Sequence, residues 1–319
     1  MDKKRREIIE NNEISELFTF SLGGYEQKVL IEGKSRNLPV LITLHGGPGT
    51  PIPFSVGCRG LFPEFTDKFI MVYWDQLGCG KNNHKIDDSF KISSFVSMTS
   101  DLIDNIRKMF PENKILLFAT SWGSVLSALV SLRKPDDIDG VVVCGQIIKD
   151  VFFNDEVIKT LENSKTPRKK LDIIKKADPK NATTKELSVA SACLNKYTNA
   201  YNNKNCQKSP MGKIITGLMT SPDYSFKDFK AIMVNGYRGN NSIWSELLKT
   251  DLTETLGKIE IPYHILQGET DIVASTAVVK SVVDASENEN LRYTIVKNTG
   301  HFPGVEMMDK VFEILCELA

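Results

Sequence analysis

The sequence predicts an α/β fold with a mostly parallel central sheet, flanking helices and an inserted helical cap. Short apolar runs alternate with helical patterns through residues 1–148. The composition then changes between residues 149 and 258, and the alternation returns over residues 259–319. Strands joined by crossover helices lie parallel in one sheet, so the first and last segments are expected to build one core.

The first core segment contains four apolar runs with almost no polar interruption. Runs of this kind are typical of strands that helices cover on both faces. The helical patterns between them predict the crossover connections. The predicted strands span residues 40–44, 69–74, 114–119 and 141–144, and the predicted helices span residues 92–110 and 122–133.

The middle segment, residues 149–258, predicts a helical cap. Apolar strand runs are absent from it, Lys and Asn become frequent, and residues 155–162 and 188–201 have helical patterns. The segment is mildly basic, which is equally typical of a solvated helical surface. The second core segment predicts that the sheet resumes, with strands at 263–267 and 291–296 and helices at 276–285 and 305–318.

Composition excludes several classes of protein. The chain has 319 residues, 41% of them hydrophobic, which is enough for a sizeable core. Lys plus Arg and Asp plus Glu both total 40, so no basic excess favours nucleic acid. No run approaches the roughly 18 apolar residues of a spanning helix. The polar, basic start of the chain lacks a signal-peptide pattern and predicts a cytoplasmic location, without stable membrane insertion. Nothing here predicts an oligomeric state.

Ser121 is the candidate nucleophile. It follows the predicted strand at 114–119 directly and precedes the predicted helix at 122–133, which is the context of a nucleophile elbow. Small residues are needed two positions before and after such a serine, and Ala119 and Gly123 meet that need. A serine at this position is also a common helix N-cap, which is the structural alternative.

The pentapeptide His-Gly-Gly-Pro-Gly at 45–49 is the most specific signal in the chain. It follows the predicted strand at 40–44, where a glycine-rich turn can present backbone N–H groups to a developing negative charge. From average residue usage, with His taken as about 2%, it should arise by chance in roughly one chain of this length in ten thousand. It is the predicted oxyanion hole.

A nucleophilic serine needs a base, and elimination among four histidines favours His301. His45 precedes the glycine turn, His84 lies in a polar segment, and His264 lies inside an apolar strand. His301 remains, in a loop between a predicted strand and the final predicted helix. A histidine of an exposed surface loop is the structural alternative.

The orienting acid should lie between the nucleophile and the base in the chain. Asp271 fits this order because it follows the predicted strand at 263–267, and its carboxylate would hold the imidazole of His301. Glu269 is the competing candidate. A helix-capping role for Asp271 is the structural alternative.

Six cysteines are scattered without a Cys-x-x-Cys pair, which predicts reduced, mostly structural thiols and no zinc site. Cys79 and Cys144 are expected to fill the core, since neither motif contains a histidine partner. Asp75, in the turn after the strand at 69–74, is expected to give architectural support near the mouth of the site.

Taken together, these motifs resemble the prolyl iminopeptidase-like branch of the α/β-hydrolases, and the match is spread over most of the core. The resemblance implies the α/β-hydrolase fold with a helical cap. It also implies that Gly47 and Trp122 donate backbone N–H groups to the oxyanion, with Gly46 shaping the turn. Two departures stand out: Leu77 where the family commonly has arginine, and Ala119 where it has glycine.

Peptidases of this branch bind the free amino group of the substrate with glutamates of the cap. Their tryptophan-glutamate and neighbouring acidic patterns are not found in this sequence, which is a third departure. Ile-Trp-Ser-Glu at 243–246 is the segment most similar to them. Glu246 is therefore the candidate amine anchor, and an exposed helix residue is the alternative.

The prediction for function is a serine hydrolase that works through an acyl-enzyme, without a cofactor or metal. The first choice of substrate is a short peptide from which an N-terminal residue such as proline is removed. An esterase, lactonase or amidase acting on a small acyl substrate is the second choice. A hydrolase-fold protein that binds a ligand without turnover is the third.

Overall fold

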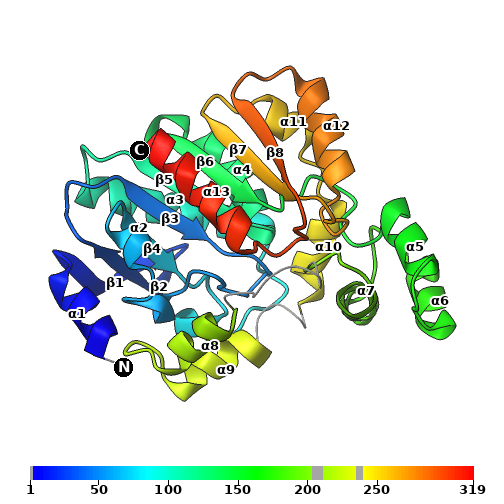
Figure 1. Ribbon diagram of the computed structural model, residues 1–319, viewed down its shortest axis with the longest axis horizontal. Helices are drawn as coiled ribbons and strands as arrows, with labels where there is room; N and C mark the ends of the chain where they lie inside the picture. The colour runs from blue at the N-terminus through cyan, green and yellow to red at the C-terminus, as the bar shows by residue number, and fades with distance from the viewer. Residues whose placement is uncertain (1–2, 203–210, 235–239) are drawn as a thin grey trace.

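The computed structural model describes residues 3–202, 211–234 and 240–319. Within these ranges eight strands form one sheet in the order β1-β2-β4-β3-β5-β6-β7-β8 (Figure 1). The pairs β1–β2 and β2–β4 are antiparallel, and every pair from β4 to β8 is parallel. The strands are β1 (Ile14–Leu22), β2 (Tyr25–Gly33), β3 (Val40–Leu44), β4 (Ile70–Trp74), β5 (Ile115–Thr120), β6 (Gly140–Cys144), β7 (Tyr263–Gly268) and β8 (Leu291–Val296).

Helices cover both faces of this sheet, as Figure 1 shows, with α13 in front and α3 and α4 behind. The core helices are α1 (Lys3–Asn11), α2 (Pro63–Thr66), α3 (Ile92–Met109), α4 (Trp122–Arg133), α12 (Thr276–Ser286) and α13 (Val305–Leu318). The described residues also form the short 3₁₀ helices η1 (Val56–Cys58), η2 (Gly80–Asn82) and η3 (Pro135–Asp137).

The central strands are buried on both faces, as their apolar runs predicted. In β5 the side chains of Ile115 and Leu117 belong to the core under α3 and α4, whereas Leu116 and Phe118 belong to the core under α13. Successive side chains of a strand point to opposite faces, so a run without polar residues fills two cores.

Between β6 and β7 the described residues contain helices and no strand. These helices are α5 (Asp155–Glu162), α6 (Arg168–Lys176), α7 (Thr184–Tyr197), α8 (Met211–Met219), α9 (Phe226–Val234), α10 (Asn241–Lys249) and α11 (Thr253–Gly257). Helices α8 and α9 pack against η1 and η2, and α11 packs against α4 and α12 of the core. The last helix of the predicted cap segment thus lies beside the core.

The helix predicted at 188–201 begins earlier and ends earlier, as α7. Its start is fixed by a capping box, in which the Glu186 amide donates to the Thr183 hydroxyl at 3.3 Å and the Thr183 amide donates to the Glu186 carboxylate at 2.7 Å. Among the helices of the described ranges, none is long and apolar enough to cross a membrane.

Candidate active site

Ser121 lies on the tight turn between β5 and α4. Its backbone has φ 49° and ψ −115°, an arrangement that residues with a Cβ rarely adopt. The turn is held by the Ser121 amide, which donates to the Cys144 carbonyl at 3.0 Å, and by the Ser124 amide, which donates to the Ser121 carbonyl at 2.7 Å. The hydroxyl makes no capping bond to α4. The N-cap alternative therefore does not describe what this side chain does.

Gly123 allows α4 to start directly against the end of β3. A Cβ at this position would lie 2.1 Å from the Leu44 carbonyl oxygen and 2.9 Å from that of His45. Both distances are far shorter than a van der Waals contact, so glycine is required here for steric reasons. Ala119, the small residue before the turn, is fully buried in the core.

A continuous chain of hydrogen bonds joins the three predicted catalytic residues. Nδ1 of His301 lies 2.8 Å from Oδ2 of Asp271, and Nε2 of His301 lies 2.8 Å from Oγ of Ser121. Because an ionised carboxylate only accepts, Nδ1 carries the proton, and Nε2 is left to accept from the hydroxyl. The structure thus brings together three side chains that are 30 and 180 positions apart in sequence.

Asp271 is fixed by its second carboxylate oxygen. Oδ1 accepts from the amides of Val273 at 2.9 Å and Ala274 at 3.0 Å, and the side chain is buried. The competing candidate, Glu269, is exposed and accepts from the Asn298 amide at 3.0 Å. The geometry therefore favours Asp271 as the partner of His301.

The loop that carries His301 is fastened to a segment between α7 and the undescribed stretch at 203–210. The His301 amide donates to the Ala200 carbonyl at 2.7 Å, and the Phe302 amide donates to the Tyr201 carbonyl at 3.0 Å. The Tyr201 ring stands edge-on to the imidazole at 5.9 Å. A Cβ on Gly300 would lie 2.6 Å from the Ala200 carbonyl oxygen. These two bonds, from His301 to Ala200 and from Phe302 to Tyr201, form a strap between parts of the chain about 100 residues apart, and no sequence motif predicted it.

The glycine turn after β3 lies against Ser121. A Cβ on Gly46 would lie 3.3 Å from Cβ of Ser121, and the Thr50 amide closes the turn on the Gly46 carbonyl at 3.1 Å. Gly47 has φ 121°, a value that favours glycine. Trp122 is the first residue of α4, where backbone N–H groups have no partner within the helix. Both predicted oxyanion donors thus come from segments that touch Ser121.

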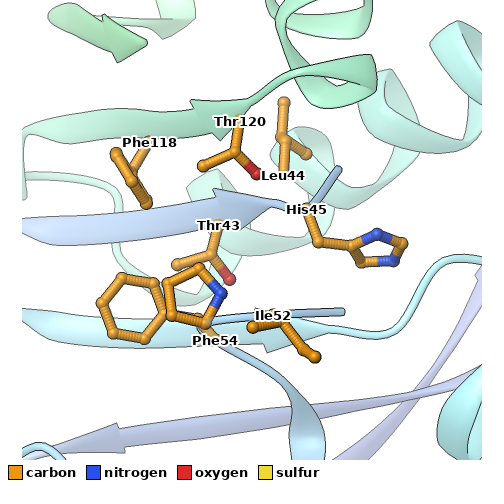
Figure 2. Close-up of a pocket in the computed structure, with 8 residues that line it drawn as sticks. Thr43, Leu44, His45, Ile52, Phe54, Phe118 and Thr120 are labelled. Carbon is orange, nitrogen blue, oxygen red and sulfur yellow. The ribbon is translucent and has the colours of Figure 1, made fainter. Parts of the chain in front are cut away.

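An apolar pocket lies beneath this turn, between the ends of β3 and β5 and the chain at 52–54 (Figure 2). Figure 2 shows the imidazole of His45 pointing away from the ring of Phe54. The pocket has no room for a molecule the size of water. It is a packing gap under the predicted oxyanion loop. Its lining comprises Thr43, Leu44, His45, Ile52, Pro53, Phe54, Phe118 and Thr120.

Asp75 joins the core to the α8–α9 pair. Its buried carboxylate accepts from the Val56 amide at 3.0 Å, from the Lys81 amide at 2.7 Å and from the Tyr224 hydroxyl. Burial raises the pKa of Asp75 to about 6, against the lowering effect of these donors. The contacts agree with the architectural role expected for this residue.

Glu246 belongs to α10, and its carboxylate lies at the N-terminus of α3. Oε2 accepts from the Ile92 amide at 2.6 Å, and Oε1 lies 4.0 Å from the Lys91 ammonium. A carboxylate at a helix N-terminus stabilises the exposed N–H groups and the helix dipole. Oε2 is thus engaged by α3, while the side chain stays partly exposed. The amine-anchor role stays a prediction.

The remaining predictions concern His264, the cysteines and metal binding. His264 is buried in β7, and burial lowers its pKa. Cys79 and Cys144 are buried free thiols, and Cys206 lies outside the described residues. In the described ranges, no group of three or more His, Cys, Asp or Glu side chains is arranged to hold a metal ion.

Comparison with known proteins decides the family. The model of a family described as serine aminopeptidase, S33, matches residues 64–306. The chain belongs to this family. Among relatives of this S33-family enzyme, the probable aminopeptidase YbaC of Bacillus subtilis is 24% identical over 311 residues, covering 94% of each chain.

Solved structures agree on the fold. The proline iminopeptidase of Mycobacterium smegmatis matches with a TM-score of 0.60 at 16% identity, over 95% of this chain and 97% of that one. The carboxylesterase CesB of Bacillus subtilis matches with a TM-score of 0.59 at 14% identity, over 99% and 95%. The predicted α/β-hydrolase fold is confirmed, and the S33-family chain is an α/β-hydrolase enzyme.

Proposed function

We propose that this enzyme hydrolyses small substrates through an acyl-enzyme on Ser121, and that it removes the N-terminal residue, such as proline, from short peptides. The observation that carries the proposal is the unbroken hydrogen-bond chain from Asp271 through His301 to Ser121. That arrangement is the recurring apparatus of serine nucleophiles on unrelated folds.

In the first half of the reaction Ser121 Oγ attacks the carbonyl carbon of the substrate. His301 Nε2 takes the hydroxyl proton, and the buried Asp271 carboxylate stabilises the imidazolium that forms. The oxyanion of the tetrahedral intermediate accepts hydrogen bonds from the amides of Gly47 and Trp122. The intermediate collapses when His301 passes its proton to the leaving amine.

In the second half a water molecule replaces the leaving group. His301 takes a proton from the water, whose oxygen attacks the acyl carbon, and a second oxyanion forms at the same donors. Collapse releases the acid and returns the proton to Ser121. The protein supplies the nucleophile, the base and the donors, so both halves use one set of residues.

The choice of a peptide substrate rests on the S33 family and on YbaC, which is named a probable aminopeptidase. An esterase is the second candidate, since a carboxylesterase shares the fold and an ester is cleaved by the same steps. The intact chain of hydrogen bonds at Ser121 argues against a protein that only binds a ligand.

The test is a panel of fluorogenic Pro-, Ala- and Leu-amides, each with a free and with a blocked amine, beside short-chain p-nitrophenyl esters. Wild type and Ser121→Ala are assayed in parallel. We expect cleavage of the free-amine amides that requires Ser121 and is lost when the amine is blocked. Cleavage of esters alone assigns the esterase function, and turnover of any substrate by Ser121→Ala at the wild-type rate contradicts the mechanism.

A further inference from the structure

Gln76 follows Asp75 at the end of β4 and is fully buried beside the glycine turn and the nucleophile elbow. Strands β4, β3 and β5 are neighbours in the sheet, so the segments that follow them meet at one edge. Gln76 comes from the first of these segments, His45 from the second and Trp122 from the third. A side chain at Gln76 can therefore bridge the two segments that carry the predicted oxyanion donors.

The side-chain amide of Gln76 makes this bridge with both of its ends. Nε2 donates to the His45 carbonyl at 3.3 Å, and Oε1 accepts from the Trp122 indole Nε1 at 2.8 Å. A primary amide is suited to the task because it offers a donor and an acceptor on one rigid plane. The distance between the glycine turn and the first residue of α4 is thereby constrained.

The backbone of Gln76 acts on the glycine turn through the His45 ring. The Gln76 amide donates to His45 Nε2 at 3.0 Å, so Nε2 is unprotonated and Nδ1 donates to the Gly46 carbonyl at 2.9 Å. Burial lowers the pKa of His45 to about 4, which keeps the ring neutral near pH 7. The Cys79 thiol also lies 3.5 Å from Nε2, and burial raises its pKa, so it adds no charge.

Holding the Gly46 carbonyl sets the direction of the Gly47 N–H. The two groups belong to one planar trans peptide and point in opposite directions. The chain of bonds from Gln76 through His45 to Gly46 therefore aims the first predicted donor. The bond to the Trp122 indole anchors the residue that carries the second donor.

We propose that Gln76 is a positioning residue, which holds the amides of Gly47 and Trp122 in the geometry that stabilises the oxyanion over Ser121. The inference rests on the proposed acyl-enzyme function. Removing an oxyanion donor from a serine hydrolase lowers kcat by about 10²- to 10³-fold, and misplacing a group by about 1 Å can cost about 10²-fold. Gln76→Ala keeps the backbone bond to His45 and removes the side-chain bonds to the His45 carbonyl and the Trp122 indole. Loss of this bridge should act on kcat.

Gln27 provides a matched control, because it makes the same pair of bonds away from Ser121. It is fully buried, its Oε1 accepts from the Trp74 indole at 2.9 Å, and its Nε2 donates to the Leu22 carbonyl at 3.1 Å. Gln27→Ala removes equivalent hydrogen bonds and packing. Any effect on kcat that Gln76→Ala has and Gln27→Ala lacks is then due to the place of Gln76 beside the predicted oxyanion donors.

The experiment measures kcat and KM of wild type, Gln76→Ala and Gln27→Ala. Thermal unfolding of the three proteins shows whether the two variants lose similar amounts of stability. We expect Gln76→Ala to lower kcat by about 10- to 100-fold with KM within about threefold, and Gln27→Ala to keep kcat within about twofold. A wild-type kcat in Gln76→Ala, or an equal loss in both variants, overturns the proposal. If Gln76→Ala does not fold, Trp122→Phe removes the indole N–H together with part of the buried ring, and Trp74→Phe is the control that loses the same atoms elsewhere.

Hydrogen exchange separates this inference from the proposed function. Exchange of the backbone amides at 45–47, 49 and 50 should be faster in Gln76→Ala than in wild type and unchanged in Gln27→Ala, whether or not a substrate has been found. Faster exchange in an enzyme without Ser121-dependent turnover removes the proposed function and leaves Gln76 as a support of the turn. Unchanged exchange in Gln76→Ala overturns the positioning role even if the enzyme is active.

Discussion

Gly123→Ala tests how closely the nucleophile elbow and the glycine turn are fitted together. The added Cβ would lie 2.1 Å from the Leu44 carbonyl oxygen, where real Cβ contacts are essentially never under 3.0 Å. The end of β3 and the start of α4 must therefore separate by about 1 Å, since both neighbouring groups are backbone and cannot rotate away. Ser121 belongs to one side of this contact and the predicted oxyanion loop belongs to the other.

The expected effect follows from that displacement. Overpacking in a filled core costs about 1–3 kcal/mol, against a gain of about 1 kcal/mol for alanine over glycine in a helix, so the net loss of stability is up to about 2 kcal/mol. A shift of about 1 Å between nucleophile and oxyanion donors should lower kcat by about 10²-fold. The catalytic loss should therefore be large in a protein that is still folded.

Urea unfolding and kcat on the best substrate of the panel measure the two effects. Gly257→Ala is the matched control, because Gly257 is also helical and a Cβ there would meet nothing within 4 Å. That variant should match or exceed wild-type stability and keep its kcat. The reasoning is refuted if Gly123→Ala has the stability and kcat of Gly257→Ala.

Three further predictions concern the triad, the strap and a buried acid. His301→Ala and Asp271→Asn should each lower kcat by at least about 10²-fold with the unfolding midpoint preserved, as steady-state kinetics and circular dichroism will report. Gly300→Ala should lower kcat by about 10- to 100-fold, because its Cβ would lie 2.6 Å from the Ala200 carbonyl oxygen and displace the His301 loop. Asp75 holds its proton to a higher pH when folded, since burial raises its pKa to about 6 from 3.8. The folded state thus binds more protons than the unfolded state between these values, so this residue's contribution to stability falls by up to about 3 kcal/mol from pH 4 to pH 7. Urea unfolding of wild type and Asp75→Asn at both pH values should show that the wild type loses its advantage over the variant as the pH rises.

Each of these has an outcome that counts against it. Near-normal turnover by folded His301→Ala removes that residue from the mechanism. Equal kinetics for Gly300→Ala and Gly304→Ala contradict the strap, because a Cβ on Gly304 would meet nothing within 4 Å. A stability difference between wild type and Asp75→Asn that does not change with pH shows that the carboxyl is not held protonated by burial.

Strands β3 to β7, which make up most of the parallel part of the sheet, were predictable because they are buried on both faces. The run at 40–44 matches β3 in full, and a strand with no exposed face has no reason to alternate polar residues. The run at 291–296 also matches β8 in full, but this edge strand is partly exposed, and its aromatic and β-branched residues are what indicate a strand. The β1–β2 hairpin was missed. Strand β1 is mostly half-exposed or exposed and mixes polar with apolar residues, so its pattern carries less information.

The residues of the hydrogen-bonded triad were predictable because each belongs to a short motif at the end of a strand, in an order that serine hydrolases of this fold share. Glu246 shows what a local motif leaves out. Its local motif resembles an amine anchor, but the carboxylate lies at the N-terminus of α3, a helix more than 130 residues earlier in the chain. No local pattern reports that contact.

Gln76 and the strap at Ala200 and Tyr201 were missed for the same reason. The sequence does not distinguish a buried glutamine from an exposed one, because its hydrogen-bond partners are known only from the folded structure. The two backbone bonds from the His301 loop use carbonyls, which every residue possesses. Contacts of this kind become visible only when segments distant in sequence are folded together.

The most direct test of the acyl-enzyme assignment is mass spectrometry of the enzyme after treatment with a fluorophosphonate. We predict one added phosphonyl group, mapped to the peptide that contains Ser121, absent in Ser121→Ala and formed at least about 10²-fold more slowly in His301→Ala. Folded wild-type enzyme that stays unlabelled, or labelling that persists in Ser121→Ala, would contradict the account.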